Sequence, residues 1–351
     1  MTAGSIETFA AQYPFTLDAF QRQALASLDA GRDVLVAAPT GSGKTVVGEY
    51  AVHAALRDGG KCFYTTPIKA LSNQKYADLC ARHGDTRVGL LTGDISVNGE
   101  ASVVVMTTEV LRNMLYAASP TLTGLRSVVM DEVHYLADRE RGPVWEEVII
   151  GLPESVRLVS LSATVSNAEE VGDWLGTVRG ATAVVVSEHR PVPLWQHVMV
   201  GANLFDLYSS RVDPTRPGPN PPINPQLAEA VRRAGRPGPS RGGRPGGGSA
   251  RGGRSGGGGR PFPRAAPRAA VIERLDRAGL LPAIVFIFSR AGCEAALQQV
   301  VNAGVRLTSP AEHARIRAVV EERCAALPPQ DLDVLGFWPW LHALTLSLIH
   351  I

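Results

Sequence analysis

No apolar run in this 351-residue sequence approaches the length needed to cross a bilayer, and the amino terminus lacks a basic segment followed by an apolar core. Cysteine is scarce: Cys62, Cys80, Cys293 and Cys324 form no CxxC pair and have no clustered histidines beside them. We therefore expect a cytoplasmic protein without a membrane partner. Its cysteines should be buried free thiols rather than disulfides or zinc ligands.

Lysine and acidic residues are missing from one stretch, between Glu229 and Glu273, which holds ten arginines and is rich in glycine and proline. Without these ten charges the net charge of +2 becomes −8, so the basicity of the chain is local. Too few apolar residues are present to offset the entropy of ordering, and we expect disorder. The arginines could hold nucleic-acid phosphates and stack on bases, or the stretch could be a passive linker. The composition is compatible with both.

Short β-branched strands alternate with helical stretches over the first half of the chain. The expected strands are 34–38, 61–65, 103–106, 127–130, 156–161 and 183–187. This alternation predicts an α/β fold, a parallel sheet flanked by helices with ligands at the carboxyl edge. A second α/β unit is expected from about Val271. It should contain a fully buried strand at 284–288, a helix at 291–302, and a helix from Pro310 to about Leu327 capped by Ser309 and Glu312.

A glycine-rich segment, Ala38 to Thr45, directly follows the first expected strand and opens a helix. In this context such a segment is typical of a phosphate-binding loop. Gly41 and Gly43 allow the backbone to curl around a β-phosphate, Lys44 can reach the β and γ oxygens, and the Thr45 hydroxyl can ligate Mg²⁺. The other residues of this predicted nucleotide site are Thr40 and Ser42. The sequence therefore predicts binding of a nucleoside triphosphate with magnesium.

Two carboxylates, Asp131 and Glu132, follow the expected strand that ends at Met130. Asp131 would hold Mg²⁺ from the side opposite Thr45, and Glu132 would orient and deprotonate the attacking water. Alone, such a pair is often a solvated turn. Paired with the phosphate loop it predicts hydrolysis of the triphosphate, with Lys44, Asp131 and Glu132 as the catalytic residues.

Phe15 and Gln21 precede the phosphate loop by about the length of one helix. An aromatic ring can lie against adenine, and a glutamine can pair with adenine N6 and N7, which would favour ATP. By itself this signal is weak, because Phe15 could equally be a core residue.

Small polar groups and a lysine recur where two other expected strands and a further apolar run end. They are Pro67, Lys69, Thr92, Gly93, Thr107 and Thr108. Hydroxyls, glycine amides and lysine suit a sugar-phosphate backbone, so these residues predict nucleic-acid binding without base specificity. Helix capping is the competing explanation for each threonine taken alone. Because such residues recur along one edge of the sheet, we favour a nucleic-acid binding surface there.

The triplet Ser162-Ala163-Thr164 follows the expected strand at 156–161. In a sheet of this type it lies beside the strand that carries Asp131. The hydroxyls of Ser162 and Thr164 could then bond His134 or the carboxylates, and we predict that these three residues couple the nucleotide state to the nucleic-acid side.

With the phosphate loop, Thr66-Pro67, Asp131–His134 and Ser162–Thr164 in this order, the chain resembles superfamily-two helicases of the DExH type. The runs at 138–153 and 189–194 look like those of Ski/Mtr-type RNA helicases, closest to actinobacterial members. The resemblance extends from about Tyr13 to about Leu341, apart from the arginine-rich stretch. It implies ATP and Mg²⁺ as cofactors, RNA as partner with 3′ to 5′ translocation, and a 3′ to 5′ exonuclease as a candidate second partner.

The resemblance also implies a domain organisation. It gives a first RecA-like ATP-binding lobe at 1–187, a connector with the arginine-rich arm at 188–270, and an incomplete second RecA-like lobe at 271–345. Ser289 and Arg290 would begin an RNA-contacting loop of that second lobe. The family's Gln-x-x-Gly-Arg-x-Gly-Arg segment, which supplies an arginine finger, is not in the sequence. We therefore expect poor hydrolysis and little unwinding by these 351 residues.

The last six residues, 346–351, back-translate as CTG-TCT-CTT-ATA-CAC-ATC, which spells a transposon mosaic end used in sequencing libraries. We expect a non-native tail there, with a native apolar end as the alternative. Two alternatives for function also stay open. One is a DNA helicase of the same superfamily, which would share every catalytic motif, and the other is a non-catalytic nucleotide or nucleic-acid binder.

Overall fold

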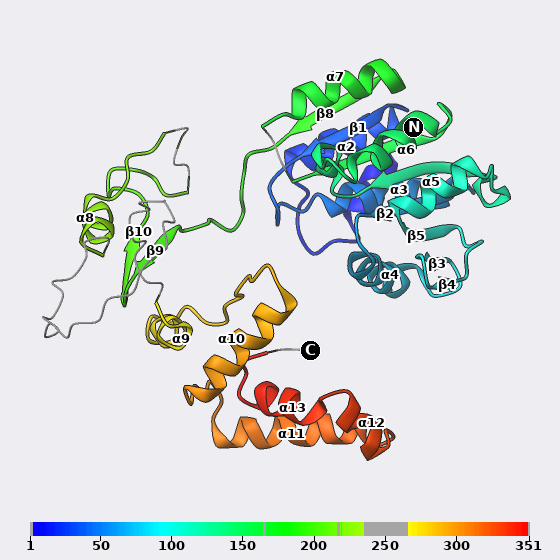
Figure 1. The fold of residues 1–351 in the computed structure, drawn as a ribbon. Coiled ribbons are helices and arrows are strands. Elements are labelled where there is room, and N and C mark those ends of the chain that lie inside the picture. The colour runs from blue at the N-terminus through cyan, green and yellow to red at the C-terminus, as the bar shows by residue number, and fades with distance from the viewer. Residues whose placement is uncertain (1–2, 164–165, 216–217, 219, 235–265, 350–351) are drawn as a thin grey trace, which may run out of the picture. The chain divides into compact units, whose positions relative to one another are not determined.

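The computed structural model describes residues 3–163, 166–215, 218, 220–234 and 266–349 (Figure 1). Thr164, one of the predicted coupling residues, lies outside the described residues, as does most of the arginine-rich stretch. The chain divides into two compact units, Met1–Pro193 and Leu194–Ile351, and each is treated by itself below.

An eight-stranded sheet forms the centre of the first unit (Figure 1). Its order is β4-β3-β5-β2-β6-β7-β1-β8, and only the β3–β4 pair is antiparallel. The strands are β1 (Asp33–Ala37), β2 (Lys61–Thr66), β3 (Val88–Leu91), β4 (Ser96–Val97), β5 (Val103–Thr107), β6 (Leu125–Met130), β7 (Arg157–Ser162) and β8 (Thr182–Val186). The parallel α/β fold is confirmed, and the six predicted strands agree to within two residues at each end. β3 and β4 were not predicted as strands, because four and two residues are too few for a clear pattern.

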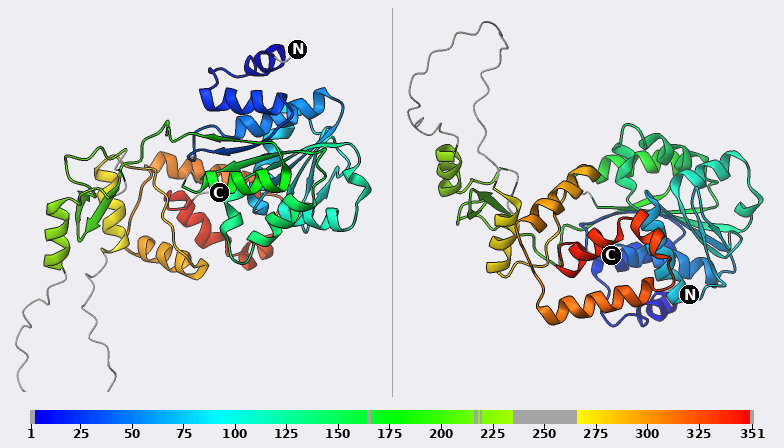
Figure 2. Two further views of the ribbon diagram at one scale, coloured as in Figure 1. Left: turned by 90° about the horizontal axis from the view of Figure 1, so that it is seen from above. Right: turned by 60° about the horizontal axis from the view of Figure 1, so that its bottom comes forward.

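Helices cover both faces of this sheet, as the further views in Figure 2 show. They are α1 (Ala3–Ala10), α2 (Ala19–Asp29), α3 (Thr45–Arg57), α4 (Lys69–His83), α5 (Thr108–Tyr116), α6 (Gly142–Gly151) and α7 (Ala168–Arg179), with 3₁₀ turns η1 (Pro120–Leu122) and η2 (Val133–Ala137). Successive strand side chains point to opposite faces. Val34 and Val36 therefore join one apolar core with Tyr50 of α3, and Leu35 joins the other with Trp145 of α6. Burial on both faces explains why the central strands are mostly apolar.

A buried ion pair joins β1 to α7 at the amino end of the sheet. Arg179 Nε lies 3.1 Å from Asp33 Oδ2, and the two side chains are only 2% and 4% exposed. The same guanidinium donates to the carbonyls of Leu152 and Val156, each at 2.6 Å. The pair therefore ties β1 and α7 to the segment between α6 and β7.

Replacing Arg179 by Met should destabilise the first unit by about 3 kcal/mol, because it leaves a buried carboxylate and two buried carbonyls without their donor. Arg157→Met is the matched control: its guanidinium lies 3.8 Å from the same Asp33 but is 42% exposed, so its loss should cost less than about 1 kcal/mol. Urea unfolding followed by tryptophan fluorescence measures both. Equal midpoints for the two variants would contradict the assignment.

The second unit contains, in its described residues, one antiparallel strand pair and several helices. The elements are β9 (His197–Val200), β10 (Asn203–Asp206), α8 (Pro225–Ala234), α9 (Arg268–Arg277), α10 (Arg290–Asn302), α11 (Pro310–Cys324), α12 (Pro329–Val334) and α13 (Phe337–Thr345). The predicted helix at 291–302 is confirmed as α10. The predicted capping box of Ser309 and Glu312 is also present, and α11 ends three residues before the predicted Leu327.

The predicted buried strand at 284–288 is wrong. These residues form no strand, and all their side chains except that of the half-buried Ile287 are exposed, with Ile284 at 77% and Phe286 at 82%. An apolar β-branched run forms a strand only when a neighbouring strand accepts its backbone hydrogen bonds, and the described residues supply none. The prediction of a second RecA-like lobe at 271–345 is not tested by this observation and stays a prediction.

The ends of the arginine-rich stretch also differ from the expected disorder. Arg232 and Arg233 lie in α8, and Arg268 begins α9. An ion pair four residues apart, Arg233 with Glu229 at 2.5 Å, supports the end of α8, whose Leu227 is buried. Helical propensity and an apolar contact thus extend order further into the stretch than its composition indicates.

The cysteines and the chain end add two observations. All four cysteines are free, as predicted, but only Cys62 is buried, while Cys293 is exposed. Leu346, in the segment expected to be a non-native tail, is buried, and its carbonyl accepts a hydrogen bond from the Leu307 amide at 3.2 Å. In the part of the chain described, every helix is too short or too polar to cross a membrane.

Candidate functional site

Three neighbouring strands bring predicted nucleotide residues and the predicted coupling residue Ser162 to one edge of the sheet. Asp131 follows β6, Ser162 ends β7, and the phosphate loop follows β1. The ammonium of Lys44 lies close enough to Asp131 and Glu132 for both carboxylates to act on its pKa. The phosphate loop and the acidic pair, separated by about ninety residues in the sequence, therefore meet at the carboxyl edge.

The phosphate loop has a backbone that only glycine adopts readily at two positions. Gly41 and Gly43 both have φ of +83°, and a Cβ at Gly43 would lie 2.7 Å from the Gln21 amide nitrogen. Lys44 Nζ donates to the Ala38 carbonyl at 2.8 Å. The hydroxyl of Ser42 is buried and has no hydrogen-bond partner in the described part of the chain. A lysine, an orphaned hydroxyl and a curled glycine backbone fit a bound phosphate.

Thr40 and Thr45 flank this loop. Thr40 is exposed, and Thr45 is the first residue of α3, at the positive end of the helix dipole.

Burial lowers the pKa of Lys44. The charges of Glu132 and Asp131 oppose that shift, and the charge of Arg190 lowers the pKa further. Arg190 is thus a second cation near the loop that sequence reasoning missed. Its only signal was its place in the 189–194 run.

The two carboxylates differ in their surroundings. Asp131 accepts hydrogen bonds from the Tyr64 hydroxyl at 3.1 Å and from the Glu132 amide at 3.0 Å, which orient it. Glu132 adopts a left-handed backbone with φ of +53°, a strained conformation that is concentrated at functional sites. Burial raises the pKa of Glu132, the charge of Asp131 raises it further, and His134 and Lys44 oppose the rise. Such a carboxylate accepts a proton more readily than an exposed one does.

The raised pKa of Glu132 predicts the pH dependence of hydrolysis. Because the pKa of Glu132 is raised in the folded state, protonation of this carboxylate favours folding as the pH falls through the raised pKa. A general base, in contrast, must be in its charged form to accept a proton. The rate should therefore fall on acidification with a midpoint above the ordinary value of 4.5. His134→Ala removes a charge that opposes the rise and should move this midpoint upward. Single-turnover hydrolysis against pH measures it, and an unchanged midpoint in the variant would contradict the assignment.

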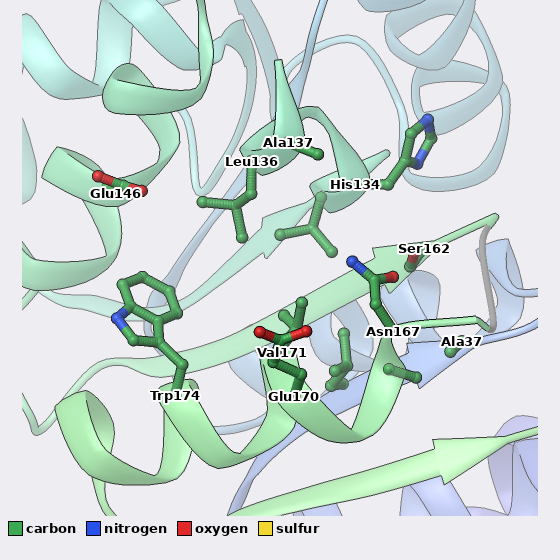
Figure 3. Close-up of a pocket in the computed structure, with 13 residues that line it drawn as sticks. Ala37, His134, Leu136, Ala137, Glu146, Ser162, Asn167, Glu170, Val171 and Trp174 are labelled. Atoms are coloured by element: carbon green, nitrogen blue, oxygen red, sulfur yellow. The ribbon is translucent and has the colours of Figure 1, made fainter. Parts of the chain in front are cut away.

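A cavity of about 330 Å³ lies beside the predicted coupling residues (Figure 3). His134 and Ser162 line one end, and Trp174 and Glu146 line the other. His134 Nδ1 is 3.3 Å from Glu132 Oε2, although the pair lacks hydrogen-bond geometry. Two of the three predicted coupling residues are thus neighbours, one of them next to the acidic pair, while Thr164 lies outside the described residues.

The predicted adenine residues lie beside the phosphate loop. Gln21 is buried; its oxygen accepts from the Asp18 amide at 2.8 Å, and its nitrogen donates to the Gly43 carbonyl at 3.0 Å. This side chain therefore caps α2 and holds the loop at once. Phe15 is 51% exposed, so it is not a core residue, and its ring lies 5.1 Å from that of Tyr13.

A groove of about 470 Å³ lies where β2, β3 and β5 end. Four of the predicted nucleic-acid residues line it, namely Pro67, Lys69, Gly93 and Thr107. Lys69 Nζ pairs with Asp94 Oδ1 at 2.8 Å, and the Thr92 hydroxyl donates to the same oxygen at 2.9 Å. The prediction of Thr108 needs correction. Its side chain is fully buried and its hydroxyl lies 3.5 Å from the Thr66 carbonyl, so it joins β2 to α5 and does not face the groove.

Glu109 and Arg141 also line the groove and were not predicted. The strand-end pattern selected hydroxyls, glycines and a lysine, so it marked neither Glu109, the second residue of α5, nor Arg141, which precedes α6. Ser289 and Arg290, in the second unit, begin α10: the Ser289 hydroxyl accepts from the Gly292 amide at 3.1 Å, which is helix capping.

Comparison with known proteins identifies this arrangement. Residues 18–171 match the family model for DEAD/DEAH box helicases. The chain is 57% identical over 351 residues to a Mycobacterium tuberculosis protein described as probable helicase HelY, covering 98% of this chain and 37% of that protein. It is 40% identical over 309 residues to the Arabidopsis thaliana DExH-box ATP-dependent RNA helicase DExH15, covering 83% of this chain and 26% of the relative.

A mouse relative, Superkiller complex protein 2, is 38% identical over 327 residues, covering 91% of this chain and 25% of that protein. The chain thus spans a quarter to about a third of the length of these relatives. The phosphate loop and the acidic pair both fall within the matched residues 18–171. The matched segment, the similarity to these relatives and the geometry of the site together show that the chain belongs to the DEAD/DEAH box helicase family.

Proposed function

We propose that this chain is the ATP-binding part of an ATP-dependent RNA helicase that couples hydrolysis to 3′ to 5′ movement along RNA and to unwinding. One observation carries the proposal: the nucleotide residues and the groove share one sheet edge, on adjacent strands. β6, which leads into Asp131, pairs directly with β2, which leads into Pro67 and Lys69. The Tyr64 hydroxyl of β2 donates to Asp131 across this pair.

On this proposal Lys44 binds the β and γ oxygens of ATP, and Glu132 takes the proton of the attacking water. Thr45 and Asp131 would hold Mg²⁺, which neutralises phosphate charge when bound. Across the described residues no three His, Cys, Asp or Glu side chains form a metal cluster. A magnesium ion held by one carboxylate, a hydroxyl and substrate phosphates needs no such cluster. The family's arginine-finger segment is not among these 351 residues. We expect weak hydrolysis from them alone, because an arginine finger is worth about 10³ to 10⁵ in rate.

On the nucleic-acid side, Pro67, Lys69, Gly93 and Thr107 would contact the sugar-phosphate backbone in the groove. The name of the Arabidopsis relative, an RNA helicase at 40% identity, supports RNA over DNA. A 3′ to 5′ exonuclease is the partner that the resemblance implies. The intact Lys44, Asp131 and Glu132 favour an enzyme over a non-catalytic binder.

Competition binding tests the nucleic-acid part of the proposal. RNA should displace a fluorescent RNA probe from the 351-residue chain at lower concentration than the matched DNA. Lys69→Ala should weaken RNA binding by about threefold to tenfold and lower the slope of log affinity against log salt by about one. Lys61→Ala is the matched control, because it removes the same charge at the amino end of β2, at the opposite edge of the sheet. Stronger displacement by DNA would favour the DNA-helicase alternative.

A further inference from the structure

Arg141 occupies the point where η2 leads into α6, at the rim of the groove. Its backbone is held by Asp138, whose carboxylate accepts from the amides of Glu140 and Arg141, both at 2.9 Å. The next residue must be small, since a Cβ at Gly142 would lie 2.4 Å from the Leu136 carbonyl oxygen. The start of α6 is therefore packed closely on η2, and the position of Arg141 follows that of η2.

The Arg141 side chain reaches into the groove. Its Nη2 donates to the Pro67 carbonyl and, at 2.8 Å, to Glu109 Oε1. The guanidinium also lies over two aromatic rings, 5.4 Å from the centre of Tyr135 and 5.6 Å from that of Trp145. A planar guanidinium can donate within its plane and stack on its face at the same time, which an ammonium cannot do.

The same rings continue toward the acidic pair. Tyr135 stacks on Trp145 with ring centres 5.5 Å apart and planes 16° apart, and it lies 5.4 Å from the ring of His134. His134 in turn is 3.3 Å from Glu132. Side-chain contacts thus run without a break from the predicted general base to the carbonyl of Pro67, through a segment of the chain separate from the Ser162 triplet.

We propose that Arg141 is a positioning residue that couples the two sites. A change in the positions of Glu132 and His134 moves the aromatic stack. Arg141 transmits this movement to Pro67 and Glu109 in the groove. This inference rests on the proposed function, since it needs nucleotide at one end and RNA at the other. Coupling of this kind is reciprocal, so it is measurable as an effect of nucleotide on RNA affinity.

The test measures binding of a short fluorescent oligouridylate to the 351-residue chain, with and without a non-hydrolysable ATP analogue and magnesium. Nucleotide should change the RNA affinity of the unaltered chain by about fivefold, the lower end of typical allosteric coupling. Arg141→Lys should reduce this change to less than about twofold while nucleotide affinity measured without RNA stays the same. Arg112→Lys is the matched control, because Arg112 lies on neighbouring α5 with Asn113 and Glu147, outside the stack, and should keep the full effect.

A second variant interrupts the same series of contacts at another residue, so that the test does not depend on whether Arg141→Lys folds. Tyr135→Leu removes the ring between His134 and Arg141, and the double variant with Arg141→Lys should lose no more coupling than either single variant, because both act through one contact. Full coupling in a folded Arg141→Lys chain overturns the inference, and so does equal RNA affinity of the unaltered chain with and without nucleotide. Failure of the unaltered chain to bind nucleotide or RNA at all is a different result, which removes the proposed function itself.

Discussion

Glu132→Gln should lower the rate of ATP hydrolysis by about 10² to 10⁴ and leave nucleotide affinity nearly unchanged. The amide keeps the size and most contacts of the carboxylate but cannot accept the proton of the attacking water. The surroundings of Glu132 support this role: burial and Asp131 raise its pKa, and its strained backbone holds the side chain at the end of β6. Single-turnover hydrolysis with RNA present measures the rate, and calorimetric titration measures the affinity.

The matched control for this variant is Glu140→Gln, an exposed residue eight positions further along the chain. It makes the same chemical change away from the phosphate loop and should keep the full rate. If Glu132→Gln hydrolyses ATP as fast as this control, Glu132 is not the general base, and the non-catalytic alternative gains support.

Lys44→Ala should weaken nucleotide binding by about 100-fold, because it removes charge-assisted hydrogen bonds to phosphate that are worth about 1.5 to 3 kcal/mol each. The loss includes a structural part, since the ammonium also donates to the carbonyls of Ala38 and Pro39 within the loop. RNA affinity measured without nucleotide should stay the same, because the groove lies at the ends of other strands. Calorimetric titration with the ATP analogue and magnesium is the measurement.

Lys61→Ala serves as the control here as well. Its ammonium pairs with Glu100 at 3.0 Å, away from the phosphate loop, so it changes the net charge by the same amount without touching the site. Equal nucleotide affinities for Lys44→Ala and Lys61→Ala would mean that Lys44 does not contact phosphate in the bound state.

Much of the first unit was predictable from local pattern. The strand before Ala38, the glycines at 41 and 43, and the Lys-Thr pair depend on neighbours in the chain, and the strand boundaries agree with the structure for the same reason. The alternation of β-branched strands with helical stretches predicted a parallel sheet, and a parallel sheet brings strand ends to one edge. The meeting of Lys44 with Asp131 follows from this rule.

Other features could not be predicted from the local sequence pattern. Thr108 has the same residue type as Thr107, yet only Thr107 lines the groove, because β5 passes directly into α5 and the Thr108 side chain is fully buried against β2. The apolar run at 284–288 is typical of a buried strand, but burial depends on a partner strand, which is a property of the surroundings.

By itself the sequence determined the parallel sheet, the phosphate loop and the acidic pair, because each depends on a short stretch of backbone whose preferences its own residues set. Only the tertiary structure decided that Arg141 joins the aromatic stack to Pro67, that Gln21 holds Gly43, and that Arg190 lies near Lys44. These arrangements bring together segments far apart in the chain, and they depend on how helices and loops pack on the sheet. No local pattern of residues encodes that packing.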